Sequence, residues 1–240
     1  MQENVDHAEI DKFTALASRW WDPAGESGPL HHINPARFEF INNQSGLSAG
    51  HSITGMRALD MGCGGGILTE KLARAGLTTT GIDMGDAPLK VARLHALESD
   101  LAIHYEKSTA EAYADSHAGQ FDIVCCMELL EHVPDPGSVV AACAKLIQPQ
   151  GQLFFSTINR NPKAWLTTVL GAEYVMNLLP KGTHNYEKFI TPAELAGYCR
   201  AAGLTVKALS GISYNPLAKT ARLTRNVDVN YLLHATRGRI

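Results

Sequence analysis

Between residues 56 and 160, short apolar runs alternate with amphipathic stretches. The runs are short enough for strands, and they read MRALDMG, TTTGID, IHYEKS, FDIVCC and GQLFFSTIN. The stretches between them, such as ILTEKLARAG and SVVAACAKLI, carry apolar residues at helical spacing. Strands that alternate with helices predict a mostly parallel sheet with helices on both faces. Near-continuous apolar strands fit a sheet that is buried on both sides.

The two ends of the chain complete this pattern. Apolar residues at helical spacing predict a helix over residues 6–21, and a Gly/Pro-rich loop follows at 22–35. A second helix is expected from Pro35 to about Asn42. Near the other end, TPAELAGYCRAAG (191–203) has the signals of a capped helix. LTVKALS and VNYLLHATR then read as two more strands, the last an antiparallel edge.

The pattern predicts an α/β fold with a doubly wound, seven-stranded, mostly parallel sheet and N-terminal helices. At 240 residues, the chain fits a single domain, residues 1–240. Within it we expect a helical cap over about residues 1–50. A further segment, about 160–190, interrupts the alternation of strand and helix and reads as an insertion.

Composition narrows the classes of protein. Hydrophobic residues make up 45% and charged residues 19% of the chain, which is typical of a globular protein. A net charge of −3 provides no basic field for a phosphate backbone, so nucleic acid is not an expected partner. Five cysteines without a CxxC pair indicate reduced thiols in a cytoplasmic protein. The polar start does not read as a signal peptide, and no run is long and apolar enough to span a bilayer.

A glycine-rich turn gives the strongest chemical signal. Gly62, Gly64 and Gly66 follow the first strand of the alternating region and precede a helix. Without a Cβ they allow a tight turn and a close approach of a ligand to the backbone. A dinucleotide site would need a further glycine at the position that Ile67 occupies. The spacing therefore favours a nucleoside cofactor other than a dinucleotide, although a glycine turn that only packs a helix on a strand remains an alternative.

An acidic residue ends the next strand. Asp83 follows Gly62 by 21 residues, which places its carboxylate beside the cleft of a doubly wound sheet. There it can accept hydrogen bonds from both hydroxyls of a ribose. The glycine turn and this carboxylate together predict a cofactor site.

The motifs around these residues resemble the class I S-adenosylmethionine-dependent methyltransferases. They are LDMGCGGG (59–66), GIDMG (81–85), FDIVCCMELLEHVPDP (121–136) and QPQGQLFFSTINR (148–160). The resemblance implies that the methionine part of S-adenosyl-L-methionine lies over Gly62 and Gly64. It also implies that Asp83 holds the ribose and that Met84 packs on the adenine.

Flanking segments resemble one family within that class, the ubiquinone-biosynthesis O-methyltransferases. They include SRWWD (18–22), PLHHINPARFEFI (29–41), STINRNPKAW (156–165) and LPKGTH (179–184). The resemblance implies methylation of ring hydroxyls on polyprenyl catechol and demethylubiquinol intermediates, and it is compatible with an assembly of quinone-pathway enzymes. It adds Arg37 and Met127 to the cofactor site. A guanidinium suits the methionine carboxylate because the two groups can form a bidentate pair.

A candidate catalytic group follows the fourth strand. A phenol has a pKa of about 10, with tyrosine as a guide, so a catechol hydroxyl needs help to lose its proton at neutral pH. Glu128, Glu131 and His132 lie at the edge of the sheet where such folds bind ligands. Either His132 acts as a base beside a carboxylate, or the three side chains hold Mg²⁺ against the catechol oxygens. The plain alternative is a helix start with solvated charges.

The inserted segment suggests a contact with lipid. Residues 160–190 carry Trp165, Leu166 and further apolar residues near helical spacing, flanked by Lys163 and Lys181. A core or lid helix would explain this pattern, and so would an amphipathic element on a membrane surface. Because a polyprenyl substrate resides in lipid, we expect a mobile cover that touches the inner face of the membrane.

Two other functions compete with a methyltransferase. A nicotinamide-dependent oxidoreductase is disfavoured by Ile67 and by the lack of an evident Tyr/Lys catalytic pair. A non-catalytic lipid-binding module would have no need to retain an intact glycine turn with Asp83.

Overall fold

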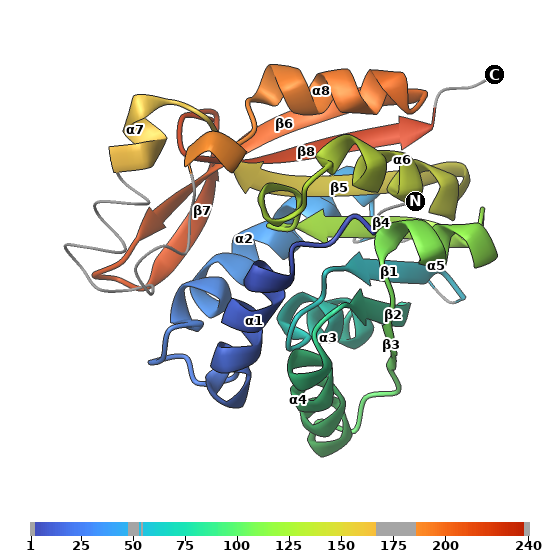
Figure 1. Cartoon of the computed structure of the whole chain (residues 1–240), viewed down its shortest axis with the longest axis vertical. Helices are drawn as coiled ribbons and strands as arrows, with labels where there is room; N and C mark the ends of the chain where they lie inside the picture. The colour runs from blue at the N-terminus through green and yellow to red at the C-terminus, as the bar shows by residue number, and fades with distance from the viewer. Residues whose placement is uncertain (1–2, 48–52, 54, 167–185, 238–240) are drawn as a thin grey trace.

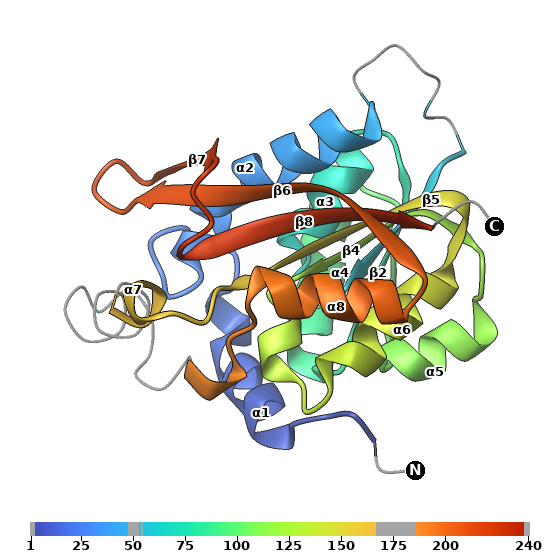
Figure 2. The same cartoon turned by 90° about the horizontal axis from the view of Figure 1, so that it is seen from above.

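A single sheet of eight strands organises the computed structural model, which describes residues 3–47, 53, 55–166 and 186–237. The strands are β1 (Arg57–Met61), β2 (Thr78–Asp83), β3 (His104–Lys107), β4 (Phe121–Met127), β5 (Ile147–Ile158), β6 (Leu204–Asn215), β7 (Thr220–Thr224) and β8 (Asn230–Arg237). Their order across the sheet is β3-β2-β1-β4-β5-β8-β6-β7 (Figures 1 and 2). The first five strands are parallel, as the alternating pattern predicts, and β6, β7 and β8 pair antiparallel.

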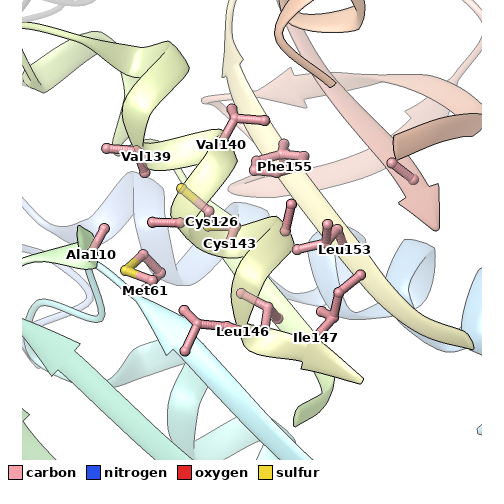
Figure 3. Packing of buried hydrophobic residues seen from close by; sticks show 14 of the residues in the cluster. Met61, Ala110, Cys126, Val139, Val140, Cys143, Leu146, Ile147, Leu153 and Phe155 are labelled. Atoms are coloured by element: carbon pink, nitrogen blue, oxygen red, sulfur yellow. The ribbon is translucent and has the colours of Figure 1, made fainter. Parts of the chain in front are cut away.

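Helices cover both faces of the sheet. They are α3 (Ile67–Arg74), α4 (Asp86–Glu98), α5 (Ala110–Ser116), α6 (Pro136–Leu146) and α8 (Pro192–Ala201), besides those of the N-terminal region. Figure 2 shows α3 on one side of the sheet and α5, α6 and α8 on the other. In the larger core, Val140 and Leu146 of α6 pack with Phe155 of β5 (Figure 3). Because these side chains are buried, they hold in place the strands whose carboxyl ends carry the site.

The N-terminal region is helical, as expected, but its second helix is longer than predicted. The region consists of α1 (His7–Leu16), the short 3₁₀ turn η1 (Ala17–Arg19) and α2 (Gly28–Ser45). Because α2 begins at Gly28, Pro35 lies inside the helix and not at its start. An internal proline removes one backbone hydrogen bond. Contacts outside the helix accompany this loss: the Asn34 side chain donates to the Ile67 carbonyl at 3.1 Å, and a ring nitrogen of His31 lies 2.8 Å from the Trp20 carbonyl.

The C-terminal part corrects two predictions. The sheet has eight strands, because β6 extends to Asn215 and turns back as the additional strand β7. The segment VNYLLHATR is β8, which pairs with β6 as expected, but it lies between β5 and β6 and is not an edge. Its residues from Tyr231 to Ala235 are all buried. Side chains buried on both faces of the sheet explain why this strand is internal.

The inserted segment is described only at its two ends. Its first part contains α7 (Pro162–Trp165), its last part contains the 3₁₀ turn η4 (Tyr186–Lys188), and residues 167–185 lie outside the described residues. Beyond it, Thr191 and Glu194 form the capping box that the sequence predicts for α8. All five cysteines are buried and unpaired. Among the described residues, none of the helices combines the length and the apolar character needed to cross a bilayer.

The internal position of β8 can be tested with two neighbouring leucines. Leu232 and Leu233 point to opposite faces and are both fully or almost fully buried. We expect Leu232→Ala and Leu233→Ala each to lower the free energy of unfolding by about 3 kcal/mol, measured by urea denaturation. Leu209→Ala in β6, at a side chain that is 43% exposed, should cost less than about 1 kcal/mol. A small effect at either Leu232 or Leu233 would contradict burial on both faces.

Candidate active site at the carboxyl ends of β1, β2 and β4

A cavity of about 880 Å³ opens at the carboxyl ends of the parallel strands. Helices α1 and α2 form its other wall. The nine residues that the sequence predicts for the cofactor site and for catalysis all line it: Arg37, Gly62, Gly64, Asp83, Met84, Met127, Glu128, Glu131 and His132. The structure therefore brings the predicted cofactor and catalytic residues into one space.

The turn after β1 is shaped by its glycines and held by Asp83. Gly62, Gly64 and Gly66 have φ values of +71°, +52° and +88°. Residues with a Cβ rarely adopt this region of φ. The Gly64 N–H donates to Asp83 Oδ2 at 2.9 Å, and the Gly85 N–H donates to Asp83 Oδ1 at 2.7 Å. Burial raises the pKa of Asp83, and these backbone donors oppose the rise. The carboxylate thus links the turn after β1 to the turn after β2.

A second carboxylate lies at the base of this turn. Asp60 of β1 is buried, and Thr69 of α3 donates a hydrogen bond to its Oδ2 at 2.6 Å. Burial raises the pKa of Asp60 to about 6, although the Thr69 hydroxyl and the positive charge of Arg37 counteract part of this rise. The sequence analysis did not assign Asp60 to the site.

Two tryptophans of the N-terminal region pack on the turn, and Trp20 also lines the cavity. Trp20 is 7% exposed, and its indole packs so closely that a Cβ at Gly64 or at Gly65 would lie 2.3 Å from a ring atom. The Trp21 indole N–H donates to the Gly65 carbonyl at 2.8 Å, and its ring stacks on His95 of α4 at 3.4 Å. Nothing in the local pattern of SRWWD (18–22) predicts this contact, because Trp21 and Gly65 are 44 positions apart.

Arg37 of α2 reaches the cavity from the side opposite β2. Its side chain is 6% exposed, and Nη2 lies 3.2 Å from Oε1 of Glu128. Among the described residues, Nε and Nη2 have no hydrogen-bond acceptor of good geometry. A buried guanidinium with spare N–H groups can bind a further anion.

Glu128 and Glu131 lie together after β4, although not on the helical turn considered from the sequence. Glu128 has a φ of +52°, and a short 3₁₀ turn, η2 (Leu130–His132), follows. Ser156 of β5 donates to Glu128 at 2.8 Å, and Thr157 donates to Glu131 at 2.8 Å. Burial favours the protonated form of both carboxyls, but at Glu128 the charge of Arg37 and the hydrogen bonds with Glu131, Ser156 and Arg37 together outweigh burial and lower the pKa. Burial and then the charge of Glu128 raise the pKa of Glu131 well above its usual range, so a proton taken up by this pair is favoured on Glu131.

His132 points toward α1. Its Nδ1 lies 2.8 Å from Oε2 of Glu9, and Lys12 donates to the other oxygen of Glu9 at 2.9 Å. Burial raises the pKa of Glu9, but the hydrogen bonds from His132 and Lys12 outweigh burial and lower it to about 2. The sequence analysis did not predict that Glu9 is the partner of His132.

The three proposed metal ligands, Glu128, Glu131 and His132, are not grouped as a metal site requires. Within the part of the chain that the structure describes, no three His, Cys, Asp or Glu side chains are grouped so that they could hold one ion. Glu128 and Glu131 are adjacent, while Nδ1 of His132 is engaged with Glu9. The Mg²⁺ hypothesis stays a prediction.

Comparison with known proteins identifies the family. A family model described as a methyltransferase domain matches residues 15–209. The chain is 58% identical to the ubiquinone biosynthesis O-methyltransferase of Klebsiella pneumoniae, over 97% of this chain and 94% of that protein. It is 56% identical to the protein of the same name from Pseudomonas fluorescens, over 98% of each. The chain belongs to the ubiquinone biosynthesis O-methyltransferase family.

Solved structures agree on the fold of this methyltransferase. The magnesium protoporphyrin IX methyltransferase of Synechocystis, crystallised with bound SAM, superposes with a TM-score of 0.65 at 17% identity, and the match covers 99% of this chain and 100% of that one. A SAM-dependent methyltransferase from Aquifex aeolicus gives a TM-score of 0.59 at 14% identity, with 95% and 98% covered. At these identities the likeness establishes a Rossmann-like methyltransferase fold.

The packing of Trp20 on the glycine turn gives a matched pair of variants. Gly64 and Gly119 both have positive φ, +52° and +67°, but a Cβ at Gly119 would meet no atom within 4 Å. We expect Gly119→Ala to cost about 1 kcal/mol of unfolding free energy from backbone strain alone. Gly64→Ala should cost about 2 kcal/mol more, because Trp20 must move, and it should shift the tryptophan emission. Equal costs in urea denaturation would show that Trp20 does not restrict the turn.

Proposed function

We propose that this methyltransferase transfers the methyl group of S-adenosyl-L-methionine to ring hydroxyls of polyprenyl catechol and demethylubiquinol intermediates. The main support is that the glycine turn, Asp83 and Arg37 face one cavity that is also lined by Glu128, Glu131 and His132. A cofactor site thus adjoins groups that can take a proton from a phenol.

We also propose that residues 1–240 form a single domain, because β8 near the C-terminus pairs with β5 of the parallel part.

The residues present fit this cofactor. Asp83 uses one lone pair of each oxygen on the backbone and keeps others for two ribose hydroxyls. The spare N–H groups of Arg37 suit a carboxylate, which the methionine part of the cofactor supplies. Met84 and Met127 line the same cavity and provide apolar contacts for the adenine and for the region of the methyl group. When bound, the cofactor supplies an electrophilic methyl group on a sulfonium.

The side chains after β4 then account for the proton of the substrate hydroxyl. His132 donates from Nδ1 to Glu9 in its neutral form, which leaves Nε2 as the basic nitrogen. We propose that Nε2 accepts the hydroxyl proton while the oxygen takes the methyl group. The protonated Glu131 and the ionised Glu128 keep the neighbouring wall polar and can orient a catechol by hydrogen bonds. A Mg²⁺ ion on the two carboxylates is the alternative route to the same phenolate.

A tailed substrate also requires access to lipid. Trp165 and Leu166, at the described start of the inserted segment, are 40% and 56% exposed, and Leu166 lines the cavity. We propose that this segment touches the inner face of the membrane from the cytoplasm, so that the ring enters the cavity while the tail stays in lipid. Contact with other enzymes that act on the same tailed intermediates forms part of this proposal.

The role of Asp83 can be separated from that of a nearby carboxylate. We expect Asp83→Asn to weaken the binding of S-adenosylmethionine at least tenfold in calorimetry, because one oxygen acceptor and the negative charge are lost. Asp86→Asn removes an exposed carboxylate only three positions away and should leave affinity unchanged within about twofold. Equal affinities for the two variants would remove Asp83 from the site.

The proton-accepting role can be tested by turnover on a water-soluble catechol. We expect His132→Ala and Glu131→Gln to lower kcat by about 100-fold or more and to change cofactor affinity by less than about threefold. His104→Ala and Glu98→Ala, at exposed positions, serve as controls. Normal turnover in both site variants would refute the assignment.

A chelator arm in the same assay separates the two routes. Activity that is lost with EDTA and restored by Mg²⁺ supports the metal route, and activity that survives EDTA supports His132 as the base. If the wild type methylates no catechol, the substrate assignment fails.

A further inference from the structure

The hairpin formed by β6 and β7 has an unusual charge. Residues 212–225, which we call the basic hairpin, contain Lys219, Arg222 and Arg225 but no Asp or Glu, in a chain whose net charge is −3. All three cations are exposed. Among the described residues, none of the three forms an ion pair. The hairpin therefore presents unneutralised positive charge.

The tip of the basic hairpin exposes a large apolar side chain. Leu217 is 96% exposed, more than any other large hydrophobic residue in the described ranges. Its position is fixed by an ordered turn, since Asn215 Oδ1 accepts hydrogen bonds from the backbone N–H groups of Leu217 and Ala218, each at 3.0 Å. A structured turn that holds a leucine in water is consistent with a contact surface.

Strand β7 has two different sides. Ala221 and Leu223 pack against the core that includes α2, while Arg222 between them is exposed, as the alternation of a strand requires. Cations on an edge strand also hinder the pairing of two sheets. That role explains Arg222 but not Leu217, because an exposed leucine would favour association.

The basic hairpin borders the active-site cavity together with the start of the inserted segment. Ile212, Tyr214 and Pro216 of the hairpin line the cavity, and so do Lys163 and Leu166 of the inserted segment. The two parts are connected, because Lys163 pairs at 2.7 Å with Asp228, which follows β7 in the chain. Figures 1 and 2 both show α7 and β7 on the same side of the molecule. Leu217 and Trp165 are thus the sequence neighbours of the lining residues Pro216 and Leu166.

We propose that the basic hairpin is a second lipid-binding element, specific for an anionic membrane surface. Leu217 enters the interfacial region, while Lys219, Arg222 and Arg225 meet lipid phosphates. This inference rests on the proposed function, because a substrate whose polyprenyl tail stays in the membrane must enter the cavity from the lipid. The two elements together would hold the cavity toward the bilayer.

Vesicle co-sedimentation of the full chain tests the hairpin directly. Vesicles of phosphatidylcholine alone are compared with vesicles that also contain phosphatidylglycerol. We expect the wild type to bind the anionic vesicles more tightly and Leu217→Ser to bind them about tenfold more weakly. The triple variant Lys219→Asn, Arg222→Gln, Arg225→Gln should lose about a hundredfold on anionic vesicles and little on neutral ones. Asn suits position 219, where φ is +52°.

Matched controls come from α4, which packs beside the opposite edge of the sheet at β3. Leu97→Ser removes a leucine that is 77% exposed, and Lys90→Gln removes an exposed cation. Both should bind like the wild type. Circular dichroism and urea denaturation confirm that every variant is folded.

Two further arms separate this inference from the proposed function. On a short-tailed, water-soluble catechol, we expect the hairpin variants to have the same turnover as the wild type. If the wild type itself does not methylate this catechol, the proposed function is refuted, but the vesicle-binding result still holds. Trp165→Ser with Leu166→Ser tests the inserted segment independently. Hairpin variants that bind anionic vesicles as tightly as the wild type, or a wild type that binds no vesicles, would overturn the inference.

Discussion

One carboxylate holds the turn on which the cavity is built. Asp83 accepts a backbone hydrogen bond from Gly64 with one oxygen and from Gly85 with the other. These bonds tie the ends of two neighbouring parallel strands together and leave the turn after β1 with three glycines at positive φ. Trp20, which also lines the cavity, packs on that turn. Side chains larger than hydrogen are thus excluded at Gly64 both by the backbone conformation and by the tryptophan.

The carboxyl groups around this turn differ in how readily they ionise. Asp60, Asp83, Glu128 and Glu131 line the cavity together with the guanidinium of Arg37. Burial raises the pKa of three of them, and only Glu128, which is paired with Arg37, has a lowered pKa. In a buried site, charges interact more strongly than in water, so this ion pair is the clearest fixed charge pair in the cavity. The three other carboxyls hold a proton more readily than they would in water.

The sequence could predict the residues that follow strands but not the contacts made by the cap. Gly62, Asp83 and Glu128 stand at the ends of apolar runs, and the carboxyl ends of parallel strands meet at one edge, so local pattern and topology suffice to bring them together. Glu9 and His132 are 123 positions apart, and Trp21 and Gly65 are 44 apart. The spacing of hydrophobic and polar residues along the chain does not reveal pairs that are so far apart, so the sequence alone does not predict them. The start of α2 is not predictable from the sequence for a similar reason. Pro35 locally disfavours the interior of a helix. The contacts of His31 and Asn34 that accompany the helix are made with distant segments.

The internal position of β8 bears on the chemistry as well as on the fold. Ser156 and Thr157 at the end of β5 donate to Glu128 and Glu131, and in the same stretch β5 pairs with Leu232 and Tyr231 of β8. The Tyr231 hydroxyl in turn donates to the Ile190 carbonyl at 2.9 Å. Without β8 and β6 beyond it, β5 would be an edge strand, and the two hydroxyls could shift with it. Because β8 and then β6 cover that strand, the carboxyl pair is held from a rigid part of the sheet, while its partner Arg37 and the Glu9 that binds His132 come from the helical cap. The site is complete only where cap and sheet meet.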